Sequence, residues 1–151
     1  MVISNLNIKL LEDRLGFIAK SVGKLKTMAS LPEERFLTGD TPAAAESYLR
    51  RCLEAMFDIG RHIIAKSAGK ASVEYKDVAL RLAENGIITG EFSERLRLMA
   101  GYRNRLVHFY NEVSEKELFQ ILRNNLSDIE QFIREITVFV ERYRQSSPPS
   151  T

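Results

Sequence analysis

Apolar residues recur along most of this chain at intervals of three and four, which is the period of an α-helix and not the alternation of a strand. The first such run spans residues 6–25, and the last spans residues 118–136. The sequence shows no strand pattern, no internal repeat and no long heptad array. The chain is therefore predicted to be all-α, an antiparallel helical bundle with short connections.

Turn and cap residues divide the chain into five predicted helices. The first extends from about Asn5 to Met28, and residues 30–44, which hold two prolines and a glycine, form a connecting loop. The other boundaries are Thr41–Pro42 and Gly69 for the second helix, Ser72 and Gly86 for the third, Phe92 and Tyr110 for the fourth, and the capping box SEKE at 114–117 for the start of the fifth.

The size of the chain suits one domain. With 151 residues and 44% hydrophobic content, residues 1–145 can bury a core without help from a metal or a disulfide. Residues 146–151 are polar and proline-rich, and we expect a disordered tail.

The single cysteine, Cys52, excludes an intramolecular disulfide and should pack as a small hydrophobe. Because neither a signal peptide nor a run of 18 apolar residues is present, we expect a cytoplasmic protein without a membrane partner.

Several kinds of catalytic site are excluded by residues that the chain lacks. Its two histidines lie in different predicted helices, and its aspartates form no D-x-D pair, so a zinc or two-metal site is not expected. The segment SAGKAS at 67–72 lacks the first glycine of a phosphate loop. We therefore predict no metal and no cofactor. Asp58 and His62, four residues apart on one helix, are expected to form a surface ion pair.

Arg103 occupies an unusual position in the fourth predicted helix. On a helical wheel, one group of apolar residues lies within about 60° of Arg103, which places the arginine near the middle of an apolar face. The group consists of Phe92, Leu96, Met99, Ala100, Leu106, Val107 and Tyr110. Burying an unpaired guanidinium costs several kcal/mol. Either Arg103 snorkels past its neighbours to water, or its charge is kept for a function.

The opposite side of this helix is polar and basic. It carries Asn104, His108 and two arginines, Arg97 and Arg105. Residues 95–111 contain four arginines, one histidine and no carboxylate, although the whole chain carries a formal charge of only +2. Such a local concentration of positive charge predicts an anionic ligand, unless these side chains only solvate the outer face.

Arg103 and His108 lie about 140° apart on the wheel, so one regular helix cannot direct both at the same ligand. Either the helix is distorted near Gly101, or two copies of the segment converge across an interface. A second apolar strip, formed by Leu98, Tyr102 and Phe109, is more than one bundle easily covers. This strip favours self-association.

Arg103, His108 and Tyr110 form an R-x4-H-x-Y motif with asparagine directly after the arginine. The motif, together with the helices from residue 50 onward, resembles the HEPN superfamily, and within it the HepT-like ribonuclease toxins that are paired with MntA-type nucleotidyltransferase antitoxins. The resemblance implies a four-helix core with a short extra helix. It also implies a homodimer in which two motifs face a shared cleft, and a metal-independent endoribonuclease.

The resemblance also implies roles for individual residues. Arg103 would grip a phosphate of the RNA and His108 would act as acid or base, with Asn104, Arg97 and Arg105 in supporting or phosphate-positioning roles. Tyr110 would accept AMP from the antitoxin, which would neutralise the toxin. Two alternatives stay open: a non-catalytic HEPN module that binds nucleotide or RNA for a partner nucleotidyltransferase, and a purely structural dimeric bundle.

Overall fold

The computed structural model describes residues 3, 5–67, 74–108 and 113–146, and within these ranges the chain is helical without a strand. This confirms the all-α prediction. The helices are α1 (Ile8–Ala29), α2 (Glu33–Phe36), α3 (Thr41–Ala65), α4 (Tyr75–Glu84), α5 (Gly90–Val107) and α6 (Glu115–Ser146).

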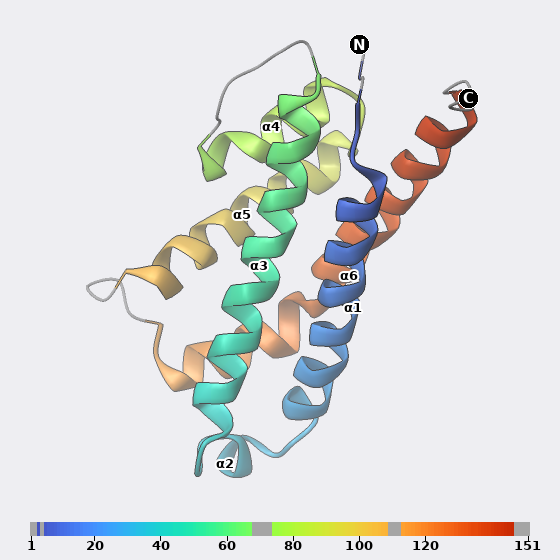
Figure 1. Cartoon of the computed structure of the whole chain (residues 1–151). Coiled ribbons are helices and arrows are strands. Elements are labelled where there is room, and N and C mark those ends of the chain that lie inside the picture. The colour runs from blue at the N-terminus through green and yellow to red at the C-terminus, as the bar shows by residue number, and fades with distance from the viewer. Residues whose placement is uncertain (1–2, 4, 68–73, 109–112, 147–151) are drawn as a thin grey trace.

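Four long helices, α1, α3, α5 and α6, form the body of the bundle. Figure 1 shows α1 running antiparallel to both α3 and α6, with α2 closing one end. The shorter α4 packs against α3 and α5 at the other end. This arrangement matches the predicted four-helix core with an extra helix, and it places α5 between α3, α4 and α6.

The core is the set of apolar stripes predicted from the helical period. Core residues such as Leu11, Ile18, Leu53 and Phe132 expose at most 1% of their surface to solvent. Cys52 is also buried, as predicted, and burial raises the pKa of its thiol to about 12. A thiol with so high a pKa is not a nucleophile near neutral pH.

The predicted loop over residues 30–44 contains the one-turn helix α2, so this part of the prediction is wrong. Pro32 stands at its N-cap, and Phe36 at its last position is fully buried. The Phe36 ring packs against Phe119 of α6, with centroids 4.8 Å apart. The turn forms because a buried aromatic residue ties it to the bundle.

Several helix ends differ from the predicted ones by a few residues. Asp40, not Thr41, occupies the N-cap of α3, which ends at Ala65; Gly69 and Ser72 lie outside the described residues. α5 begins at Gly90 because the Thr89 hydroxyl accepts a hydrogen bond from the N–H of Phe92 at 3.2 Å. Gly86 directly follows Asn85, the C-cap of α4, and has a φ of 71°, a backbone conformation that favours glycine.

The predicted capping box at the start of α6 is only half formed. The Ser114 hydroxyl accepts from the N–H of Glu117 at 3.1 Å, as expected. The Glu117 carboxylate, however, binds the side chain of Arg105 on α5. At its other end α6 continues to Ser146, and Arg144 forms an ion pair with Glu12 of α1 at 2.9 Å. Ser146, the first residue of the expected tail, is therefore helical.

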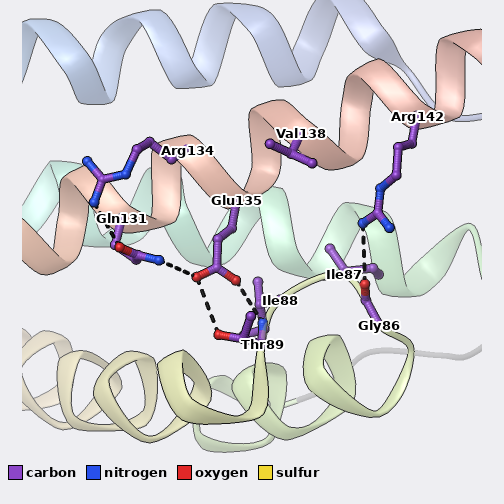
Figure 2. Close-up of a pocket in the computed structure, with 9 residues that line it drawn as sticks. All are labelled: Gly86, Ile87, Ile88, Thr89, Gln131, Arg134, Glu135, Val138 and Arg142. Atoms are coloured by element: carbon purple, nitrogen blue, oxygen red, sulfur yellow. Dashed lines mark hydrogen bonds between the residues drawn. The ribbon is translucent and has the colours of Figure 1, made fainter.

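A clamp on α6 fixes the beginning of α5. Figure 2 shows Glu135 of α6 directed at Thr89, whose backbone N–H donates to its carboxylate at 2.7 Å. Gln131 donates to the same carboxylate at 2.7 Å. These groups line a cavity of about 420 Å³ beside the α4–α5 connection. Because the Glu135 carboxylate already accepts hydrogen bonds from Thr89 and Gln131, we assign it the structural role of holding the start of α5.

Candidate active site

Three of the four arginines in α5 are paired with carboxylates. Arg105 donates to both oxygens of Glu117, one of them at 2.7 Å, and this hydrogen bond lowers the pKa of the Glu117 carboxyl below its ordinary value. Arg95 lies 3.3 Å from Asp128. Arg97 lies 3.8 Å from Glu94, with 69% of its side chain exposed. The basic stripe predicted from residues 95–111 is therefore largely neutralised by carboxylates outside that segment.

Arg103 is the exception. Its side chain is half-buried, and it forms no ion pair with a carboxylate of the described residues. The guanidinium stacks on the ring of Tyr75, with Cζ 3.8 Å from the centroid, and Nη1 donates to Asn104 Oδ1 at 3.2 Å. Nε is buried without a hydrogen-bond partner in the described structure. Arg103 is thus partly buried, and no salt bridge among the described residues explains its charge.

Asn104 and Tyr75, which both contact Arg103, also line a small polar cavity. Its volume is about 220 Å³, and its other lining residues are Arg61, Glu74 and Lys76. The cavity lies where the C-terminal part of α3, the start of α4 and α5 meet. An arginine, a lysine and an amide are groups that bind phosphate oxygens.

His108 lies on a different side of α5. It is the C-cap of that helix, its backbone is extended (φ −104°, ψ 119°), and its side chain is exposed. The helix therefore ends at Val107, three residues before the predicted end. His108 lines a cavity of about 490 Å³ together with Glu46 and Arg50 of α3 and Arg105; Arg103 is not among its lining residues. The structure thus brings Arg103 together with Asn104, but it does not bring Arg103 to His108 within one chain.

The last motif residue, Tyr110, lies outside the described residues, as does Phe109 of the predicted apolar strip. Of the strip's other members, Leu98 is 62% exposed. Tyr102 packs against the core of its own chain, next to residues of α3 and α6 such as Leu49 and Ile121. The expectation that Tyr102 belongs to an uncovered strip is wrong, because α3 and α6 cover it.

The second histidine has a structural role. His62 Nε2 accepts a hydrogen bond from the backbone N–H of Asn7 at 3.1 Å, next to the start of α1. Burial, and then the nearby Lys66, lower the pKa of His62, which favours the neutral ring that this bond requires. The predicted ion pair with Asp58 is therefore wrong. In the described part of the chain, no three side chains of metal-ligating type gather at one place.

Two residues beside Arg103 were not identified from the sequence. Tyr75 and Arg61 lie in other helices, 28 and 42 residues earlier, and the helical period carries no information about contacts between helices. One signal was available: Gly60, in the middle of a long apolar helix, indicates that another helix approaches closely there.

The model of the ribonuclease HepT-like family matches residues 18–136, and the chain belongs to this family. The mRNA nuclease HepT of Shewanella oneidensis is 36% identical over 85 residues, which cover 56% of this chain and 64% of that protein. The tRNA nuclease HepT of Aphanizomenon flos-aquae is 24% identical over 138 residues, covering 91% and 94%. The relatives are thus named as nucleases of two kinds of RNA.

A solved structure has the same fold. It is that of a tri-AMPylated HEPN toxin from Shewanella oneidensis in complex with MNT antitoxin, which matches with a TM-score of 0.76 and 26% identity over 85% of this chain and 97% of that one. In the part of this chain that the structure describes, no helix has the length and apolar character needed to cross a membrane.

Proposed function

We propose that this protein is a metal-independent endoribonuclease, the toxin of a toxin–antitoxin pair, and that Arg103 and His108 carry its chemistry. Arg103 carries most of the argument: among the arginines of α5, it alone lacks a carboxylate partner in the described structure. A charge retained without a partner costs stability, so a ligand that neutralises it is the best explanation. In a ribonuclease family, that ligand is a phosphate of RNA.

The reaction we propose is attack of a ribose 2′-hydroxyl on the adjacent phosphate. A base removes the hydroxyl proton, the new P–O bond forms, and the bond to the 5′-oxygen breaks as an acid protonates that oxygen. His108, exposed at the end of α5, is suited to one of these proton transfers. Arg103 stabilises the negative charge that develops on the phosphate, and Asn104 holds the guanidinium through its hydrogen bond.

The pairing of Arg105 and Arg97 with carboxylates favours supporting roles over direct binding. Arg105 ties the end of α5 to the start of α6 and lines the His108 cavity, so it would position His108. Arg97, paired with Glu94 and largely exposed, would contribute only long-range attraction to RNA.

The proposed partner is an MntA-like nucleotidyltransferase that transfers AMP to Tyr110. The support is the AMPylated state of the related toxin in its antitoxin complex, together with the R-x4-H-x-Y motif of this chain. A phosphate group attached two residues after His108 would compete with RNA by charge and by size. The site of action we propose is the cytoplasm.

Cleavage of RNA in a chelator tests the proposal. Wild-type protein should cleave mixed cellular RNA in excess EDTA, and His108→Ala should lower the rate by about 100-fold or more, the usual effect of losing an acid–base group. Arg51→Gln is the matched control, because it removes an exposed arginine of α3 that stacks on Phe17 and Tyr48. Equal rates for wild type and His108→Ala would refute the role of His108, and RNA binding without cleavage would favour the non-catalytic module.

A further inference from the structure

Two neighbouring arginines of α5 are held in place by different kinds of group. Glu117 holds Arg105 through both carboxylate oxygens, and this ion pair compensates the charge of the arginine. Arg103 has no carboxylate partner among the described residues, and the ring of Tyr75 lies against it instead, with Cζ 3.8 Å from the ring centroid. A neutral ring orients a guanidinium without cancelling its positive charge.

Stacking also leaves hydrogen-bond donors of Arg103 available. A ring that stacks on a planar guanidinium covers its face, whereas the five N–H groups point outward in the plane. Nη1 donates to Asn104 Oδ1 at 3.2 Å, and Nε is buried without a hydrogen-bond partner in the described structure. The remaining donors can bind two oxygens of a phosphate in the fork geometry that arginine favours.

The position of Tyr75 is itself fixed by the core. Tyr75 is the first residue of α4, and its ring meets the fully buried ring of Phe57 on α3 at 89°, with centroids 5.5 Å apart. Nearly one turn further along α4, Val78 lies against Gly60 of α3, where an added Cβ would be 2.5 Å from Val78 Cγ1. Arg61 of α3 also stacks on the Tyr75 ring, at 4.0 Å. The ring is therefore held by α3, and it presents a fixed surface to α5.

We infer that Tyr75 is a positioning residue of the active site, which holds the guanidinium of Arg103 where the phosphate of the cleaved bond binds. This inference rests on the proposed function. An arginine side chain has several rotatable bonds, and fixing it in advance lets it stabilise the developing charge without reorganisation during the reaction. Tyr75 itself does not contact the RNA in this role. The helix α4, which carries no residue of the R-x4-H-x-Y motif, thus acts in catalysis through Arg103.

Cleavage kinetics of Tyr75 variants test this role. Tyr75→Leu removes the ring and should lower kcat about tenfold or more with little change in KM, because a displacement of about 1 Å in the site can cost about 100-fold in rate. Tyr75→Phe keeps the ring and should stay within about threefold of wild type. Tyr48→Leu is the matched control: Tyr48 of α3 is also half-buried, with Arg51 Cζ 5.4 Å from its ring centroid, and its loss should leave kcat unchanged.

A double-mutant cycle separates the positioning of Arg103 from a general loss of structure. If Tyr75 acts through Arg103, Tyr75→Leu should change kcat by less than about twofold once Arg103→Met is present. An effect of the same size in both backgrounds would make Tyr75 a structural residue and overturn the inference. A loss in Tyr75→Phe as large as that in Tyr75→Leu would also overturn it, because the hydroxyl and not the ring would then be responsible.

A second ringless variant keeps the test decisive if circular dichroism shows that Tyr75→Leu does not fold. Tyr75→Gln then takes its place, since glutamine is polar and a good helix former at a half-buried position. If neither ringless variant folds, Tyr75 is structural and the inference is overturned. A wild-type protein that cleaves no RNA would remove the proposed function and this inference with it, whereas cleavage by wild type with additive effects of the two substitutions would overturn the inference alone.

Discussion

Arg103 and Arg105 are two residues apart on one helix, and the structure gives them different surroundings. Arg105 has both oxygens of Glu117 as acceptors, whereas Arg103 has an aromatic ring, one amide oxygen and a buried Nε without a partner. A buried donor without an acceptor costs about 1–3 kcal/mol, and stacking on Tyr75 returns about 0.5–2 kcal/mol. These terms nearly cancel, so packing alone gives no reason for an arginine at this position.

Arg103→Met is therefore expected to change the free energy of unfolding by no more than about 1 kcal/mol, and the sign can be favourable, since the thioether leaves no donor unpaired. RNA cleavage should fall sharply in the same variant. Urea unfolding measures the first effect and the cleavage assay the second. Arg105→Met is the control, expected to lose at most about 1 kcal/mol because its ion pair is more than a third exposed. A loss above about 2 kcal/mol in Arg103→Met would make Arg103 a structural residue.

At the scale of the helices, the packing of α4 onto α3 decides where Tyr75 stands. Gly60 faces Val78 and Leu82 of α4, and only a residue without a Cβ fits there. A branched side chain such as Val78 has little rotamer freedom, so it cannot turn away from an added methyl group. The close approach of the two helices is thus encoded by one glycine.

Gly60→Ala should destabilise the protein by about 1–2 kcal/mol, because an overpacked core costs about 1–3 kcal/mol and the better helix propensity of alanine returns up to about 1 kcal/mol. Gly23→Ala in α1 is the control: nothing lies within 4 Å of its added Cβ, so only the propensity gain remains and stability should rise. Chemical denaturation of both variants measures these changes in the free energy of unfolding. If Gly60→Ala proved as stabilising as Gly23→Ala, the helices would have room to move apart.

The helical elements could be predicted because each buried stripe follows the period of its own helix. The predictions that were wrong concern features that depend on contacts with another segment of the chain. Phe36 forms a helical turn because Phe119 of α6 receives it, and the carboxylate of Glu117 leaves its capping box because Arg105 of α5 is a better partner. The periodicity of one helix predicts which face is buried, but not which residues of other helices contact it.

The candidate site was predictable to the same extent. The R-x4-H-x-Y motif drew attention to Arg103 and His108, and the 140° between them on the wheel agrees with their separate surroundings in the structure. The wheel could not show that Arg95, Arg97 and Arg105 form ion pairs with carboxylates of α5 and α6. It also could not show Tyr75 and Arg61, which the packing of α4 brings to Arg103.

For the whole molecule, the separation of Arg103 from His108 favours a site shared between two chains. α5 is regular up to Val107 and shows no distortion near Gly101 that would turn the two side chains together. Leu98 and Val107, 62% and 37% exposed, leave an apolar part of α5 uncovered by its own bundle. Of the two explanations offered by the sequence, convergence of two copies therefore has more support, and a homodimer is the proposed state.

Mixing two inactive variants tests this shared site. If each site takes Arg103 from one chain and His108 from its partner, a dimer of one Arg103→Met chain and one His108→Ala chain holds one intact site and one doubly altered site. After exchange of subunits, half of the dimers are mixed, so an equimolar mixture should recover up to about a quarter of wild-type cleavage. Light scattering on the same samples should give about twice the chain mass of 17.2 kDa. A mixture that exchanges subunits but stays as inactive as its components would place Arg103 and His108 in the same chain's site, and a monomer at micromolar concentration would remove the shared site altogether.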